Sequence, residues 1–142
     1  MRINDVVSAK DSPDVVTVPP GATVAELVAL LAEHNIGALV VVDGGTVVGI
    51  VSERDVVRHL GRDADLLGRP VSDLMVTDLH TCTGTDLIES VMETMTEARI
   101  RHLPVLEDGD LAGIISIGDV VKSRMSQLEF ERDQLDSYVH QT

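Results

Sequence analysis

Aromatic residues are almost absent from this chain, which has one Phe, one Tyr and no Trp among its 142 residues. The core must therefore be built from aliphatic side chains, and a surface that stacks nucleic-acid bases on aromatic rings is not expected. Positive charge is also scarce, because 11 Lys and Arg residues face 24 Asp and Glu residues, for a net charge of −13. Nucleic acids and anionic membranes bind basic surfaces, so we expect neither as a partner. A small anion would have to be held by local groups against this overall field.

Cysteine pairs and long apolar runs are missing as well. The single cysteine, Cys82, cannot form an internal disulfide and lacks the Cys or His spacing of a zinc site. The N-terminal stretch MRINDVVSAK has no apolar segment of signal-peptide length. No other stretch approaches the roughly 20 apolar residues of a membrane-spanning helix. These absences favour a cytoplasmic protein with no membrane partner.

The chain contains an internal repeat. Residues 24–57 align with residues 88–121 without a gap, at an offset of 64 residues, so that GIVSERD (49–55) coincides with GIISIGD (113–119). The lead-in INDVV (3–7) also resembles VSDLM (71–75). The repeat divides the chain into a first repeat (residues 1–60), a linker (61–69), a second repeat (70–124) and a C-terminal helical tail (125–142).

Within each repeat the hydrophobic pattern changes from a helical to an extended period. Residues 24–31 and 88–95 carry apolar side chains at positions i, i+3, i+4 and i+7, the pattern of an amphipathic helix. Each is followed by two β-rich runs joined by a Gly-containing turn, which predicts a β-hairpin, and then by a short helical pattern. The sequence therefore predicts an α/β (α+β) fold in which each repeat has the order helix, strand, strand, helix after an extended lead-in.

The order of these elements, the twin G-I-[VI]-S-x-x-D corners and the stretch IRHLPVLEDGDLAGIIS (100–116) resemble the CBS-domain family in its tandem form, the Bateman module. The resemblance spans residues 3–124 and implies two βαββα repeats packed about a pseudo-twofold axis, with two clefts between them. Members of this family commonly bind adenosine-containing ligands such as AMP, ADP or ATP, and sometimes NAD or S-adenosylmethionine. They regulate other proteins, usually without catalysis, and often form homodimers.

The repeated corner has a physical role that does not depend on the resemblance. A serine at a helix start has unpaired N–H groups and a partial positive charge beside it, which together favour an anion. The aspartate three residues later offers two acceptor oxygens to a ribose diol, and Ile50 or Ile114 could form an apolar wall for adenine. The same Ser-x-x-Asp pattern is also a capping box, which stabilises a helix by about 0.5–2 kcal/mol. Both roles remain open for each corner.

The resemblance, carried over residue by residue, implies two unequal clefts. The Asp55 cleft would be formed by Ile50, Ser52, Arg54, Asp55, Thr81, Cys82, His102 and Pro104. The Asp119 cleft would be formed by Ile114, Ser116, Asp119, Thr17, Val18, Gly37 and Ala38. Arg54 is placed to bind a phosphate, whereas its counterpart, Gly118, has no side chain. His102 likewise has Ala38 as its counterpart, so we expect the Asp55 cleft to be the stronger phosphate site.

Other candidate residues are weaker. Arg99 and Arg101 lie just before a strand and could reach a phosphate, but solvated surface is the favoured interpretation. Four histidines have no partner at metal-ligand spacing and are expected at the surface or at helix ends: His34, His59, His80 and His140. No base accompanies Cys82, which we expect to be a small packed residue and not a nucleophile. No catalytic or metal site is predicted.

These observations favour a non-enzymatic sensor that binds an adenosine-containing ligand, requires no cofactor and signals to a separate, unidentified partner protein. A ligand-independent structural or interaction module is the alternative, and an enzyme is the least favoured class. The tail has apolar residues on a rough helical stripe, so it could fold back on its own repeat or pack on a second subunit: Met125, Leu128, Leu135 and Tyr138. Together with the resemblance, this pattern predicts a homodimer.

Overall fold

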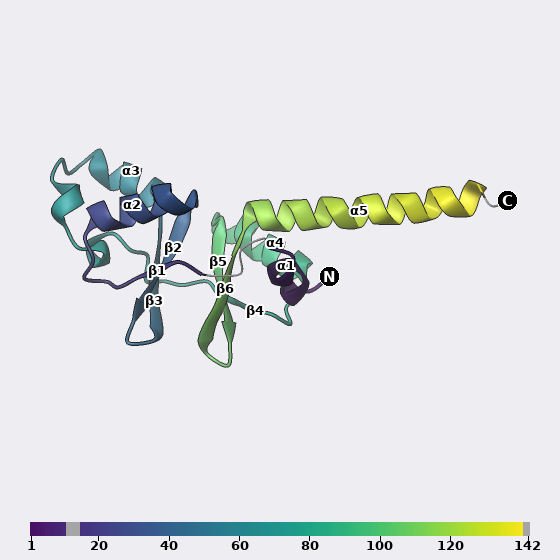
Figure 1. Ribbon diagram of the computed structural model, residues 1–142, viewed down its shortest axis with the longest axis horizontal. Coiled ribbons are helices and arrows are strands. Elements are labelled where there is room, and N and C mark those ends of the chain that lie inside the picture. The colour runs from purple at the N-terminus through teal and green to yellow at the C-terminus, as the bar shows by residue number, and fades with distance from the viewer. Residues whose placement is uncertain (11–14, 141–142) are drawn as a thin grey trace.

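One order of elements occurs twice in the structure, a computed structural model that describes residues 1–10 and 15–140 (Figure 1). The first copy comprises β1 (Thr17–Val18), α2 (Val24–His34), β2 (Ala38–Asp43), β3 (Thr46–Ser52) and α3 (Glu53–Leu60). The second comprises β4 (Cys82–Thr83), α4 (Ile88–Ala98), β5 (His102–Glu107), β6 (Asp110–Ser116) and α5 (Ile117–His140). The lead-in elements are a short helix, α1 (Ile3–Ser8), and two 3₁₀ turns, η1 (Leu66–Gly68) and η2 (Val71–Asp73). The order of elements predicted within each repeat is confirmed.

Each repeat forms a three-stranded sheet, in the orders β1-β2-β3 and β4-β5-β6. The first strand of each sheet is parallel to the second, and the second and third strands form an antiparallel hairpin. Residues 44–45 and 108–109 at the hairpin turns have positive φ, the conformation that a two-residue turn of this type requires. The predicted β-hairpins are therefore confirmed.

Each repeat has its own hydrophobic core, but each core includes a lead-in segment from the other repeat. The core beneath α2 takes in Val71 from η2 and Leu74, which follows that turn. The core beneath α4 takes in Ile3 and Val6 from α1. All four side chains are at most 4% exposed. The repeats are therefore interlocked, because burying either core needs residues from both.

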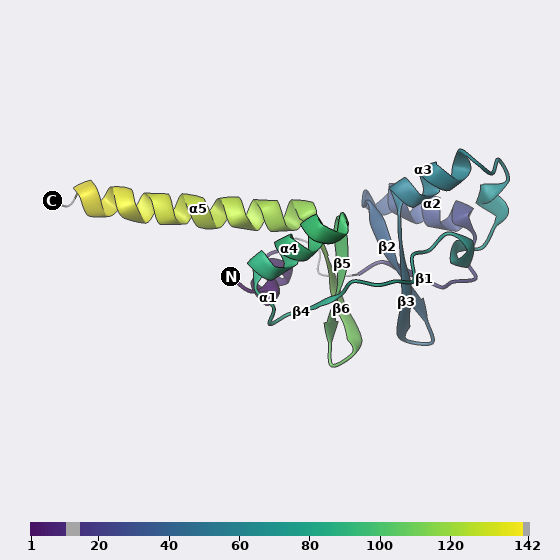
Figure 2. The ribbon, with the colours of Figure 1, turned by 180° about the vertical axis from the view of Figure 1, so that it is seen from behind.

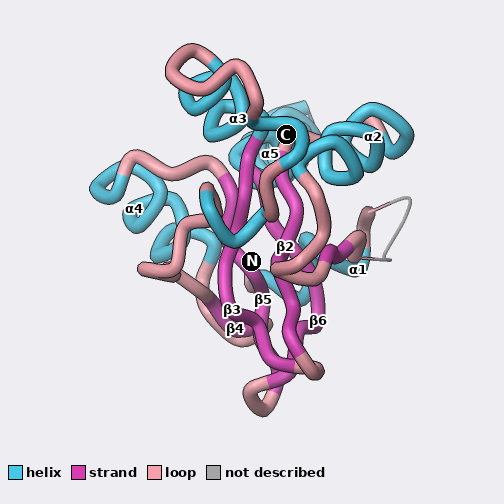
Figure 3. The backbone as a smooth tube through the Cα atoms, turned by 90° about the vertical axis from the view of Figure 1, so that its left-hand side faces the viewer, coloured by secondary structure: helices cyan, strands magenta, loops and turns pink. Residues whose placement is uncertain are grey.

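The two hairpins lie side by side in the middle of the molecule, with the helices on the outer sides (Figure 2, Figure 3). Strand β3 of the first sheet contacts strand β6 of the second. The connection from η2 to β4 follows β3, where Ile50 and Val76 exchange two backbone hydrogen bonds of 3.0 and 2.8 Å. The result is the predicted pair of βαββα repeats related by a pseudo-twofold axis.

The last helix, α5, extends far beyond the second repeat as a single rod (Figure 1). Its first half contacts α1 and α4, whereas every residue from 128 to 140 is exposed. The helix predicted after the second hairpin and the helical pattern of the tail are thus one continuous helix. Within the described residues, none of the helices is both long and apolar enough to cross a bilayer.

Candidate functional site

Two cavities lie where the repeats meet, one beside each serine corner. The Asp55 cavity has a volume of about 730 Å³, and the Asp119 cavity has a volume of about 750 Å³. Both are lined by residues from both repeats. Gly37, Ala38 and His102 line both cavities, so these three residues lie between them.

The serine corners form complete capping boxes. Ser52 donates to Asp55 Oδ2 from its backbone N at 2.9 Å and from Oγ at 3.0 Å, and Asp55 N donates to Ser52 Oγ at 3.3 Å. In the second corner, Ser116 N donates to Asp119 Oδ2 at 2.9 Å, and Asp119 N donates to Ser116 Oγ at 3.1 Å. The predicted caps are confirmed, and both use Oδ2. Within residues 1–10 and 15–140, Asp55 Oδ1 has no hydrogen-bond partner, so it can still accept from a hydroxyl group.

Four arginines line the Asp55 cavity. Arg54 and Arg58 lie one turn apart on α3 of the first repeat, and Arg99 and Arg101 precede β5 of the second. All four are exposed, and among the described residues none of their side chains forms a hydrogen bond or ion pair. Three acidic residues share the lining: Glu53, Asp55 and Asp78. The cavity is therefore locally positive in a chain whose net charge is −13.

Only part of this cluster is predictable from the sequence. Arg54 lines the cavity as predicted. Arg99 and Arg101 are expected at the solvated surface. Both are indeed exposed, but both also line the cavity. Arg58 is not among the predicted residues, although its spacing of four from Arg54 on one helix is a signal for a shared face. His80, expected at the surface, is exposed and lines the cavity as well.

Apolar side chains complete the lining of the Asp55 cavity. Ile50 is present as predicted, together with Val57, Val76 and Ile100. Val57 and Val76 are 69% and 42% exposed, so apolar surface is open to a ligand there. Apolar surface beside fixed cations suits a molecule with an uncharged ring at one end and an anion at the other.

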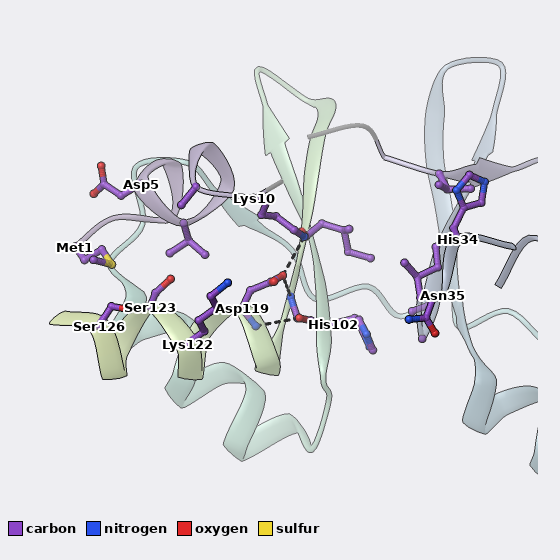
Figure 4. A pocket seen from close by; sticks show the side chains of 18 residues that line it. Met1, Asp5, Lys10, His34, Asn35, His102, Asp119, Lys122, Ser123 and Ser126 are labelled. Carbon is purple, nitrogen blue, oxygen red and sulfur yellow. Dashed lines mark hydrogen bonds and ion pairs between the residues drawn. The ribbon is translucent and has the colours of Figure 1, made fainter. Parts of the chain in front are cut away.

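A lysine occupies the Asp119 cavity (Figure 4). Lys10 Nζ lies 2.9 Å from Asp119 Oδ2 and donates to the backbone oxygen of Ile114 at 2.8 Å. Burial acts to raise the pKa of the Asp119 carboxyl, but hydrogen bonds from the Ser116 backbone and from Lys10 outweigh burial and lower that pKa. Lys10 is not among the predicted residues. It follows α1, which packs on the second repeat, so its place depends on the exchange of lead-ins.

His102 lies between the two cavities with its ring against Gly37. A Cβ added to Gly37 would be 3.5 Å from His102 Nε2. Burial lowers the pKa of the imidazole, and this effect outweighs the carboxylates of Asp119 and Glu53, which raise it. The ring is therefore neutral near pH 7. The family resemblance implies a place for His102 in the Asp55 cavity alone, whereas the structure places it beside both cavities.

The remaining predicted residues divide into those that line a cavity and those that lie beside one. The Asp55 cavity is lined by Ile50, Ser52, Arg54, Asp55 and His102. The Asp119 cavity is lined by Ile114, Ser116, Asp119, Gly37 and Ala38. The other five lie in the strands or at their entries and line neither cavity: Thr17, Val18, Thr81, Cys82 and Pro104.

Cys82 shows why the first strand of each repeat contributes little to the cavities. Its side chain points into the second hydrophobic core, as Val18 points into the first, and Sγ donates to the Pro104 oxygen at 3.8 Å. Burial raises the pKa of the Cys82 thiol to about 11. Cys82 is thus a packed residue. No group of three His, Cys, Asp or Glu side chains is placed to hold a metal ion in the described part of the chain.

Known proteins share both the sequence and the fold. The CBS domain model matches residues 4–62 and again residues 71–126. The CBS domain-containing protein YhcV of Bacillus subtilis is 34% identical over 124 residues, which cover 84% of this chain and 86% of that protein. The crystal structure of the CBS-domain containing protein ATU1752 from Agrobacterium tumefaciens has a TM-score of 0.82 and 44% identity, covering 87% of this chain and 99% of that one.

A more distant structure shares the fold. The CBS domain pair of protein MJ0100, solved in complex with 5′-methylthioadenosine and S-adenosyl-L-methionine, has a TM-score of 0.80 at 22% identity. The match covers 89% of this chain and 98% of that one, and at this low identity it shows only that the fold is shared. The two matched segments and the repeated βαββα fold together show that this chain belongs to the CBS-domain family, as a tandem pair of CBS domains.

Proposed function

We propose that this CBS pair is a non-enzymatic sensor that binds a phosphate-bearing adenosine ligand in the Asp55 cavity and signals to a separate protein. The four arginines of that cavity carry the proposal. They come from both repeats and have no hydrogen bond or ion pair within the described residues, in a chain of net charge −13. Guanidinium groups bind phosphate oxygens through paired N–H donors, so an anion is the expected occupant.

The rest of the cavity suits the adenosine part of such a ligand. Asp55 Oδ1 can accept from a ribose hydroxyl, and the apolar surface of Ile50, Val57 and Val76 can cover an uncharged base. AMP, ADP, ATP and NAD all carry phosphate and suit the arginines, whereas S-adenosylmethionine offers them no phosphate.

Calorimetry of the whole chain with AMP, ADP, ATP, NAD, S-adenosylmethionine and adenosine tests the proposal. The phosphate-bearing ligands should bind more tightly than adenosine, and raising the salt concentration should weaken them. Arg99→Ala should weaken ATP binding by about 10- to 100-fold, because hydrogen bonds to charged groups contribute about 1.5–3 kcal/mol each. Arg62→Ala is the matched control, since Arg62 is exposed and does not line the cavity. The proposal is wrong if none of these ligands binds, or if both variants act alike.

Signalling follows from the position of the cavity. A ligand that contacts Arg54 on one repeat and Arg101 on the other favours the arrangement of repeats that brings these residues closest. The sensor so proposed is a cytoplasmic homodimer, and its partner reads the change in arrangement. Hydrogen exchange of both repeats with and without ATP measures this coupling.

A ligand-independent interaction module is the second candidate. The Ser52 and Ser116 capping boxes are complete without a ligand, which favours this alternative. It predicts that the oligomeric state and hydrogen exchange do not change with any of the nucleotides. Enzymatic activity is not proposed.

A further inference from the structure

Helix α5 has a pattern that neither cavity uses. Val121, Met125, Leu128, Arg132 and Leu135 are spaced alternately by four and three residues, the spacing of the seam positions in a coiled coil. We name these five residues the α5 stripe. Its four apolar members are 45%, 56%, 48% and 65% exposed in chain order. Seam positions of this kind normally pack against another helix.

The outer half of α5 needs a packing partner. Every residue from 128 to 140 is exposed, and this part of the helix runs on beyond the second repeat (Figure 1, Figure 2). Isolated helices shorter than about 12–15 residues are marginal in water, and helices in proteins are stabilised mainly by packing of one face. The apolar stripe supplies such a face.

We propose that the α5 stripe packs against the α5 stripe of a second copy of this chain, in antiparallel orientation. The flanking charges determine the orientation. Lys122 and Arg124 flank the first half of the stripe, whereas Glu129, Glu131 and Asp136 flank the second half. Parallel helices would place Glu131 of each copy beside Asp136 of the other. Antiparallel helices place Lys122 of each copy beside Asp136 of the other, with one such pair at each end of the stripe.

The antiparallel register also accommodates Arg132. Aligning the seam positions places Met125 opposite Leu135 of the second copy and Leu128 opposite Arg132 of the second copy. In parallel helices the two Arg132 side chains would face each other within the seam. In antiparallel helices they lie in separate layers, near the glutamates that flank the centre of the stripe. This pairing supplies the interface of the homodimer in the proposed function, and it is tested on protein without ligand, so that its failure is distinguishable from a failure of nucleotide binding.

Sedimentation equilibrium of the whole chain tests the stripe. The wild-type chain should be a dimer, and Leu128→Lys should weaken dimerisation by about 100-fold or more, because it would place a buried ammonium group opposite Arg132 of the second copy in each of two layers. Phe130→Lys is the matched control. Phe130 is 64% exposed and lies two residues away, on the opposite side of the helix, so this variant should remain dimeric. Circular dichroism verifies that both variants fold. A monomeric wild-type chain, or a dimeric Leu128→Lys variant, overturns the proposal.

Disulfide formation tests the orientation. In a mixture of Met125→Cys and Leu135→Cys chains, antiparallel packing should give a disulfide between the two variants. Parallel packing would instead give a disulfide between two Leu135→Cys chains when that variant is oxidised alone, and this result overturns the orientation. If neither disulfide forms, the α5 stripes of the two copies do not pack against each other, and the proposal is wrong. The native Cys82 is buried, so it adds little background.

Discussion

Lys10 Nζ lies 2.9 Å from Asp119 Oδ2, whereas Asp55, the counterpart of Asp119 in the first repeat, has no cation partner in the described part of the chain. The two cavities therefore differ in the groups that they offer to a ligand. In the Asp55 cavity, a carboxylate oxygen and the arginines are open. In the Asp119 cavity, Oδ2 of the carboxylate is paired with Lys10, which also donates a hydrogen bond to the Ile114 backbone oxygen. A ribose binding at Asp119 would lie beside the Lys10 ammonium and compete with it for the carboxylate, so we expect one bound nucleotide per chain.

Removing the Lys10 ammonium should open the second cavity. Lys10→Met keeps most of the aliphatic side chain but leaves Asp119 without its cation, so calorimetry should find two nucleotides per chain where the wild type binds one. Lys122→Met is the matched control, because Lys122 lines the same cavity but is not the partner of Asp119. That variant should still bind one nucleotide. If Lys10→Met also binds one, Lys10 does not close the cavity.

His102 should make the protein less stable in mild acid. Burial lowers the pKa of its imidazole below the ordinary value of 6.5, so the unfolded chain takes up this proton at a higher pH than the folded chain does. The stability that depends on the neutral ring is fully present above about pH 6.5 and is lost as the pH falls through the folded pKa. The pKa of the Asp119 carboxyl is lowered from 3.8, so Asp119 titrates at lower pH and does not contribute to the loss of stability in mild acid.

Urea unfolding from about pH 8 to about pH 5 measures the effect. His102→Gln should lose stability less steeply than the wild type as the pH falls. His140→Gln controls for the loss of an imidazole, because His140 is exposed at the end of α5. An equal slope for His102→Gln and the wild type would show that other groups cause the acid sensitivity.

The fold could be predicted from the sequence because its determinants are local and occur twice. The helical spacing of residues 24–31 and 88–95 and the turns at 44–45 and 108–109 each act within a short segment, and the structure confirms them. The capping boxes could be predicted for the same reason, since Ser52 and Asp55 are three residues apart.

The full lining of the cavities could not be predicted, because it depends on contacts between repeats. An apolar pattern indicates that Ile3 and Val6 are buried, but it does not say against which sheet. Their packing on the second repeat is what brings Lys10 to Asp119. Similarly, the residues next to Arg101 in the sequence do not reveal whether its side chain lies in open solvent or beside a cavity lined by the other repeat.

Cys82 should react slowly while the protein is folded. Burial, and secondarily the charge of Asp86, raises the pKa of its thiol to about 11. At pH 8 only about one thiol in a thousand is then ionised, and the thiolate is the reactive form. A disulfide reagent should therefore label the native chain far more slowly than the chain in urea. Labelling at equal rates would contradict the burial of Cys82 in the second core.

Gly49 and Gly113, at equivalent positions of the two hairpins, should respond differently to alanine. A Cβ on Gly49 would lie 2.8 Å from Met75 Sδ and 3.1 Å from the Val76 backbone oxygen, because the connection to β4 crosses there. A Cβ on Gly113 would meet Val7 Cγ1 at 3.4 Å, an ordinary contact. In urea unfolding, Gly49→Ala should reduce the free energy of unfolding by about 1–3 kcal/mol. Gly113→Ala should leave it unchanged or raise it by about 0.5 kcal/mol, because alanine restricts the unfolded chain more than glycine. Equal losses would mean that the crossing segment does not contact β3 closely.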